Sequence, residues 1–185
     1  MKLRDLAYIA LGTALMCVLS PISIPIGIIP ISLATLVVYL IGCLLSPLKA
    51  TLSVVLYIII GLCGLPVFSK YQAGFTVLAG PTGGFILGYV LGVLLQSLFV
   101  TKFKEKKAAY IIGIIFSTII IYAFGLIWFM IVTNGKYTFQ QAMASCVYPF
   151  IPGDLIKLVI AVSVSYKLRP ITDKLQDTTH LRKTH

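Results

Sequence analysis

The chain has 185 residues, of which 59% are hydrophobic and 11% charged, and its mean hydropathy is +1.03. A domain of this length cannot bury so much apolar surface in a soluble core, so the composition excludes an ordinary soluble protein and indicates a membrane protein. The net charge of +10 would suit nucleic acid, but the positions of the lysines and arginines favour a topological explanation.

Six apolar stretches, most of them long enough to cross a bilayer, predict an all-α integral membrane protein. We expect one bundle of six transmembrane helices in a membrane domain covering residues 1–169. Residues 170–185 are polar and predict a cytoplasmic tail without fixed structure. The six stretches are Leu6–Ser20, Ile31–Leu45, Ala50–Leu65, Gly83–Val100, Ala108–Val132 and Pro152–Tyr166.

The lysines and arginines divide unequally between the two sides of such a bundle. Twelve fall on the side of both termini and two on the other, with one inside the last stretch. This asymmetry predicts a multi-pass protein of the cell membrane with both termini cytoplasmic. The basic segment 102–107 then marks a cytoplasmic loop, and we expect no nucleic-acid partner because stacking aromatics are nearly absent from it. The two outward residues are Lys70 and Lys136.

The first apolar stretch carries small residues on one helical face. Ala7, Ala10 and Ala14 share this face, and Ala10 and Ala14 form a small-xxx-small pattern with Gly12 nearby. Such a face lets another helix approach closely in lipid. From spacing alone, packing within the chain's own bundle and docking of a partner protein are equally well supported.

The connection between the first two stretches, residues 21–32, is apolar but contains a proline about every fourth or fifth residue. The prolines exclude a continuous helix. Irregular backbone at membrane depth needs protein or a cavity beside it, which favours a lid over an outward-facing pocket. The alternative is a plain connection lying on the bilayer surface.

The connection of residues 64–85 is long and carries aromatic and hydrogen-bonding side chains, and loops of this length are usually functional. Pro81, Gly83 and Gly84 predict a tight turn whose N–H groups open the next helix, a geometry suited to polar or anionic ligand atoms. Close helix packing would explain the two glycines equally well.

Asp154 and Lys157 stand three residues apart at the start of the last apolar stretch. One helical face carries both of them. A charge at this depth costs at least about 2.5–3.5 kcal/mol, so intramembrane charges are usually paired, turned inward and functional. The alternative is a structural ion pair that only orders the last helix.

Several kinds of chemistry lack their motifs in this sequence. The four cysteines stand singly and the only histidines are His180 and His185, so we expect no metal site and no histidine-based hydrolase. A phosphate-cradling loop is also missing, so the chain alone is not expected to hydrolyse ATP. We therefore expect no catalytic residues and no resident cofactor.

Three motifs, in order along the chain, resemble a known family. They are Gly64-Leu-Pro-Val-Phe68, Gly80-Pro-Thr-Gly-Gly-Phe-Ile-Leu-Gly-Tyr89 and Pro149-Phe-Ile-Pro-Gly-Asp-Leu-Ile-Lys157. The chain to about Arg169 resembles the BioY family, the biotin-specific S components of energy-coupling-factor transporters. A fourth family segment corresponds to Pro30-Ile-Ser-Leu-Ala-Thr35, with Ala34 where glutamine is common and Ser32 where threonine is common.

The resemblance implies a six-helix membrane protein that captures biotin from outside. It also implies partners, namely a transmembrane coupling protein and two ATPase subunits that supply the energy. Ala10 and Ala14 match the alanine-rich face that the family is thought to present to the coupling protein.

Biotin has an apolar bicycle, a ureido group and a carboxylate, so its site needs an acceptor, donors or a cation, and aromatic walls. We expect Asp154 to accept from the ureido group and Lys157 to donate to a ligand oxygen. Lys70 or the turn at Gly83 and Gly84 is expected to receive the carboxylate. The further expected contacts are Ser32 and Thr35 as hydrogen-bonding residues and Phe68, Tyr71, Phe85 and Tyr89 as walls.

Two other functions remain open at this level. An autonomous proton-coupled or facilitated carrier would use Asp154 as its protonatable group. An intramembrane enzyme is the weaker alternative, because Ser145 and Ser163 lack a histidine partner, although a serine with Lys157 is conceivable.

Overall fold

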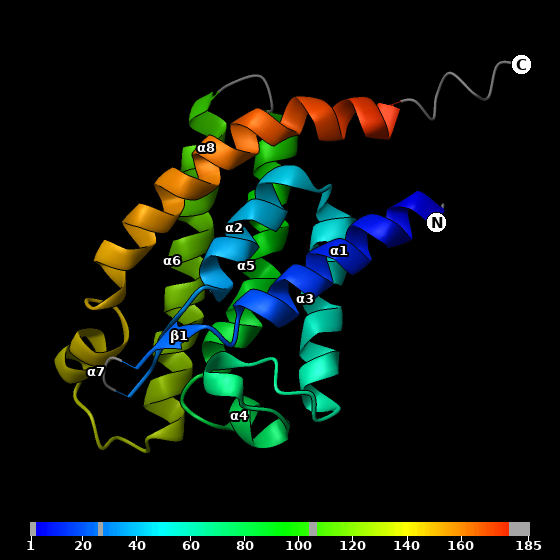
Figure 1. Cartoon of the computed structure of the whole chain (residues 1–185). Helices are drawn as coiled ribbons and strands as arrows, with labels where there is room; N and C mark the ends of the chain where they lie inside the picture. Colours follow the sequence, from blue (N-terminus) through cyan, green and yellow to red (C-terminus); the bar gives the residue numbers. More distant parts are fainter. Residues whose placement is uncertain (1–2, 26–27, 104–106, 178–185) are drawn as a thin grey trace, which may run out of the picture.

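Helices dominate the fold of the computed structural model, which describes residues 3–25, 28–103 and 107–177 (Figure 1). The elements are α1 (Leu3–Leu19), β1 (Ser23–Ile24), β2 (Ile31–Ser32), α2 (Ala34–Leu44), α3 (Pro47–Leu62), a 3-10 turn (Ser69–Tyr71), α4 (Phe75–Ala79), α5 (Gly83–Lys102), α6 (Lys107–Val132), α7 (Phe139–Cys146) and α8 (Phe150–Asp177).

The long helices pack in pairs around a shared interior. α5 lies against α6 along much of its length, α8 lies against α2, and α1 lies against α3 (Figure 1). α2 and α3 also contact α5, which is therefore central to the bundle. The main apolar core combines residues of α1, α2, α3, α5, α6 and α7.

The short elements gather at one end of the bundle. Figure 1 shows β1, α4 and α7 at the end opposite the connection between α5 and α6. β1 and β2 form an antiparallel pair in which Ser23 faces Ser32 and Ile24 faces Ile31. The end that carries Lys70 and Lys136 is thus built from loops, the hairpin and short helices.

Three glycines explain the close approach of α5 to α6. Gly84, Gly88 and Gly92 recur every fourth residue on the face of α5 that meets α6. A Cβ on Gly88 would lie 3.1 Å from Ile121 Cα, and one on Gly92 would lie 2.8 Å from Ser117 Oγ. Small residues at an interface let helix backbones meet in lipid, as they do here.

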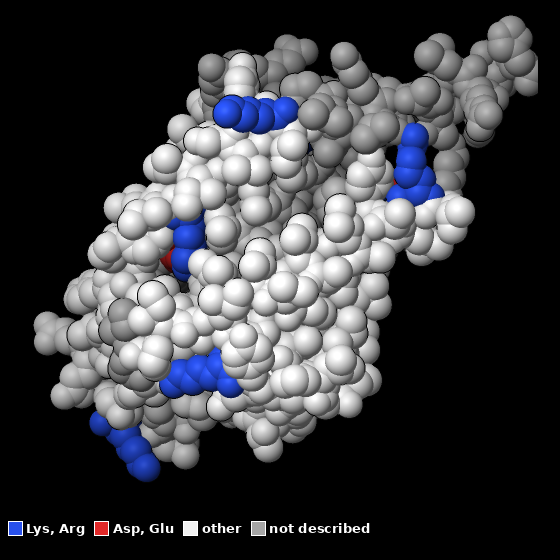
Figure 2. All heavy atoms as spheres, viewed as in Figure 1, with Lys and Arg blue, Asp and Glu red and all other residues white. Residues whose placement is uncertain are grey.

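By length and composition, two helices of the described chain, Gly83–Lys102 and Ala108–Val132, are long and apolar enough to cross a membrane. A third candidate is α7 together with residues 150–169 of α8, with a bend of 41° between them. α2 and α3 are shorter apolar helices. The fold is mostly helical, as expected, and its exposed surface carries many large apolar side chains with few charges between them (Figure 2), as suits a protein solvated by lipid.

Some boundaries differ from those expected from the sequence. α4 and α7 lie in segments expected to be connections. α7 begins with a capping box, in which Thr138 and Gln141 satisfy each other's backbone N–H groups. α8 continues to Asp177, past the expected end of the membrane domain at residue 169; the rest of the predicted tail lies outside the described residues.

Candidate functional site

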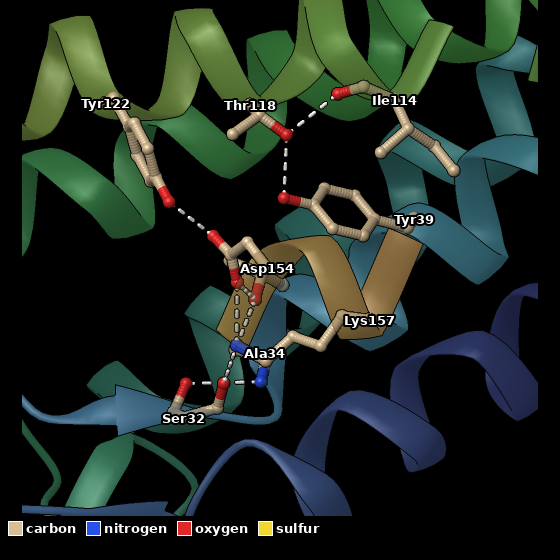
Figure 3. Close-up of polar contacts among 9 residues, drawn as sticks. Ser32, Ala34, Tyr39, Ile114, Thr118, Tyr122, Asp154 and Lys157 are labelled. Atoms are coloured by element: carbon tan, nitrogen blue, oxygen red, sulfur yellow. Dashed lines mark hydrogen bonds and ion pairs between the residues drawn. The ribbon is translucent and has the colours of Figure 1, made fainter. Parts of the chain in front are cut away.

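Asp154 and Lys157 form a buried ion pair in the first two turns of α8. Lys157 Nζ lies 2.8 Å from Asp154 Oδ1, and the two side chains are 8% and 6% exposed respectively. The spacing of three residues places both on the face of α8 that turns toward α2 and α6, as Figure 3 shows. The pair is therefore withdrawn from lipid, as the cost of an intramembrane charge requires.

The N-terminal region of α2 satisfies the ammonium group of Lys157. Nζ donates to the backbone oxygen of Ser32, to Thr35 Oγ1 and to Asp154 Oδ1, each at 2.8 Å. Thr35 Oγ1 in turn donates to Asp154 Oδ1 at 3.1 Å. All three N–H donors of the lysine are thus engaged within the protein.

Tyr122 on α6 completes the network from the other side. Its hydroxyl donates to Asp154 Oδ2 at 2.6 Å, and the ring points toward the carboxylate in Figure 3. One helical turn earlier on α6, Thr118 hydrogen-bonds to Tyr39 of α2 at 2.7 Å. Three helices therefore converge on one carboxylate, whose negative charge is stabilised by three donors.

A small cavity adjoins the ion pair on the side of the hairpin and α4. Its volume is about 30 Å³, which is room for roughly one water molecule. Aromatic and aliphatic side chains form most of its wall, and the polar groups of the network form the rest. The lining residues are Ile29, Pro30, Ser32, Thr35, Ser69, Val77, Thr82, Phe85, Ile86, Tyr89, Tyr122, Phe150, Asp154 and Lys157.

A second, wider recess lies next to this inner cavity. Its volume is about 310 Å³, and Pro30, Val77 and Thr82 border both spaces. The remaining lining of this outer recess is Ile28, Lys70, Gln72, Thr76, Gly80 and Pro81. The two spaces together extend from the ion pair to the loop end of the bundle.

The structure brings most of the expected substrate contacts to the inner cavity. Asp154 and Lys157 form its charged wall, and the others that line it are Ser32, Thr35, Phe85 and Tyr89. They come from the hairpin, α2, α5 and α8. Residues distant in the sequence therefore line one small cavity.

Phe68 and Tyr71 lie outside both spaces. Phe68 is fully buried in the apolar core, where its ring meets Tyr57 edge-on with 5.5 Å between ring centroids. Tyr71 is 67% exposed and lines neither the inner cavity nor the outer recess. In this structure Phe68 is a packing residue and Tyr71 is a surface residue, and neither forms a wall of the two spaces.

Gly83 and Gly84 also lie outside the lining, and packing accounts for both of them. A Cβ on Gly83 would lie 1.8 Å from the backbone oxygen of Leu78, and one on Gly84 would lie 2.2 Å from Trp128 Cβ. Any side chain would displace α4 or α6. Of the two explanations that the sequence left open, the geometry favours close packing.

Tyr122 is the principal site residue that the sequence analysis missed, together with Phe150 and the hairpin residues Ile29 and Pro30. A signal for Tyr122 exists, because Thr118 and Tyr122 are one turn apart on a strongly apolar helix and so share a face. Which way that face turns is decided by packing, which the sequence does not specify.

Ala10 and Ala14 are exposed on α1, whose buried face is formed by Ile9, Gly12, Thr13 and Met16. Neither alanine packs inside this chain's bundle. The small-residue face is thus free to meet lipid or a partner.

Residues 1–174 match the family model described as BioY family. The chain belongs to the BioY family. It is 35% identical to "Biotin transporter BioY" of Thermotoga maritima, over 91% of this chain and 98% of that protein. It is 37% identical to "Biotin transporter BioY2" of Lactococcus lactis subsp. cremoris, over 86% of each chain.

A solved structure agrees with this BioY fold. The S-component for biotin from an ECF-type ABC transporter is similar with a TM-score of 0.83 and 30% identity, covering 90% of this chain and 91% of that one. The family resemblance noted in the sequence is confirmed. The relatives are named as transporters, in agreement with the expectation that the chain is not an enzyme.

Proposed function

We propose that this BioY-family chain is the substrate-capture component for biotin uptake across the cell membrane. It binds biotin from outside and passes it inward through an ATP-driven coupling module. The observation that carries the proposal is the buried Asp154–Lys157 pair, which faces a small cavity with aromatic walls. The names of the relatives support biotin as the ligand.

The chemistry of the cavity suits a ureido ring. Asp154 Oδ2 accepts a hydrogen bond from Tyr122, and a carboxylate oxygen can accept more than one hydrogen bond. A ureido N–H can therefore bind there. Phe85, Tyr89 and Phe150 supply the apolar surface that the bicycle requires. Donation by Lys157 to the ligand requires exchange of one of its three protein contacts.

Binding requires the inner cavity to enlarge. Pockets for small molecules occupy about 300–1,000 Å³, whereas the present volume is about 30 Å³. Pro30 and Val77 of α4 border both the inner cavity and the outer recess, and the segments that carry them are the ones we expect to separate. Without such a movement the inner cavity is too small for the biotin bicycle.

The proposed topology has six membrane-crossing units, namely α1, α2, α3, α5, α6 and α7 with α8. Both termini are cytoplasmic, because the lysines and arginines concentrate on that side. The partners are a transmembrane coupling protein and two ATPase subunits, as the ECF assignment of the similar structure supports. Ala10 and Ala14 provide the docking face for the coupling protein, and the chain needs no cofactor of its own.

A ligand panel tests the function directly. The full chain, purified in detergent, is heated with biotin, riboflavin, thiamine or folate at equal concentration, and the melting temperature is recorded. Biotin should raise the melting temperature well above the others, because a ligand that binds only the folded state stabilises it. An equal response to all four vitamins, or to none, contradicts the proposal.

Uptake separates the proposal from an autonomous carrier. Vesicles that contain this chain without ATPase subunits should show no sustained biotin uptake under a proton gradient. Uptake that follows the gradient would support proton coupling through Asp154 instead.

A further inference from the structure

The outer recess next to the proposed biotin site has the character of a second binding compartment. Its wall contains the polar residues Lys70, Gln72, Thr76 and Thr82. Because Pro30, Val77 and Thr82 also border the inner cavity, a molecule that fills the inner cavity and continues outward passes directly into this recess.

Charge determines which end of an acidic ligand each compartment favours. In the inner cavity, the three donors of Lys157 are engaged and the Asp154 carboxylate is close by. A second carboxylate there would meet a like charge, which disfavours it. Among the residues that line the outer recess, Lys70 is the one cation, and no acidic residue lines it.

The backbone of Lys70 is held in place by the hairpin segment. Its φ is 60°, in the left-handed region that residues with a Cβ seldom adopt. Its N–H donates to the backbone oxygen of Pro21 at 3.2 Å and to Ser23 Oγ at 3.1 Å. These bonds fix the backbone position of Lys70, which lines the recess.

We propose that Lys70 is the residue that recognises the ligand's carboxylate, and that the ligand occupies both compartments. The ring lies on Asp154, the aliphatic chain passes Pro30, Val77 and Thr82, and the carboxylate meets the Lys70 ammonium in the outer recess. Gln72 and Thr76 provide neutral hydrogen bonds to it. This assignment rests on the proposed function and adds the origin of selectivity for a free acid.

A pair of ligands that differ only in charge tests it. The affinities of biotin and of biotin amide are measured by calorimetry with the full wild-type chain and with Lys70→Gln. An exposed ion pair contributes modestly, so Lys70→Gln should weaken biotin about fivefold and leave the amide unchanged. Lys70→Arg should restore the preference for biotin, and Lys136→Gln, a change at an exposed lysine outside the recess, should alter neither affinity.

The possible failures are distinct. Equal weakening of both ligands by Lys70→Gln would mean that Lys70 only shapes the loop, and no weakening of either would mean that the carboxylate binds elsewhere; both results overturn the assignment while the proposed function stands. If the wild-type chain binds neither ligand, the proposed function fails and this assignment fails with it.

Discussion

Lys157 on α8 donates to the backbone carbonyl of Ser32, the last residue of β2, at a distance of 2.8 Å. The contact joins residues 125 positions apart. It fixes the start of α8 against the junction between the hairpin and α2. A ligand that perturbs Lys157 would therefore act directly on the segment that borders the cavity.

Breaking the ion pair on one side should be costly. In Lys157→Met the buried Asp154 loses its cation, and removal of one partner from a buried pair destabilises a protein by about 3–5 kcal/mol. We expect a clear fall in melting temperature and loss of biotin binding. The double variant Asp154→Asn with Lys157→Met should regain much of the stability without regaining binding. If the double variant regained both stability and biotin binding, the ion pair would only order α8.

Tyr122→Phe should weaken biotin binding about tenfold, because the variant removes a charge-assisted hydrogen bond of 2.6 Å that orients Asp154 Oδ2. Calorimetry on the purified chain measures the change. Tyr148→Phe, at an exposed tyrosine outside the lining, is the matched control and should bind like the wild type. If the two variants bind equally well, Tyr122 has no part in the site.

The hydroxyl of Thr35 contacts both Asp154 and Lys157. Removing this hydroxyl should therefore destabilise the protein more than removing the Thr35 methyl group. Thr35→Val leaves a Lys157 donor without a partner, at a cost of about 1–3 kcal/mol, whereas Thr35→Ser keeps the bridge. Melting temperatures in detergent compare the two variants. A serine variant as unstable as the valine variant would show that packing, and not the hydrogen bonds, is what matters at this position.

Glycine substitutions distinguish packing from ligand binding on α5. Gly84→Ala places a Cβ 2.2 Å from Trp128 Cβ and 2.5 Å from the backbone oxygen of Phe124. Overpacking of this kind lowers the free energy of unfolding by about 1–3 kcal/mol, so we expect a lower melting temperature. Gly153→Ala on α8 meets only Ile31, at 3.7 Å, and should be tolerated. Normal stability of Gly84→Ala with lost biotin binding would instead restore Gly84 as a ligand contact.

Bulky residues on the exposed face of α1 should separate binding from transport. Ala10→Trp and Ala14→Trp are predicted to keep biotin affinity but to abolish uptake in cells that supply the coupling module, because a closely packed helix interface has no room for an indole. Ile119→Trp, on the exposed face of α6, should leave uptake intact. Normal uptake by both alanine variants contradicts docking through this face.

The sequence predicts helices well where apolar length alone decides them. The stretch expected at Ala108–Val132 and the observed α6 differ by one residue at the start, and Gly83–Val100 matches the start of α5. α4 and α7 were missed because they are short and lie in segments rich in turn and polar residues, where capping decides the structure. The Thr138 and Gln141 capping box was the available signal for α7.

The sequence predicts the pairing of unusual charged residues better than the orientation of aromatic ones. Asp154 and Lys157 are recognisable in the sequence because they are charged residues within an apolar segment. Their pairing follows from a spacing of three residues on a helix. Tyr122 and Phe68 look alike in sequence, each an aromatic residue among aliphatic ones. Only the rotation of their segments turns Tyr122 to the carboxylate and Phe68 to Tyr57.

The most direct test of the account is a structure of the full chain with biotin bound. We predict a ureido N–H within hydrogen-bonding distance of an Asp154 oxygen, with the bicycle between Phe85, Tyr89 and Phe150 in an enlarged cavity. Biotin bound elsewhere, with the network of Ser32, Thr35, Asp154 and Lys157 unchanged around a closed cavity, would contradict the account.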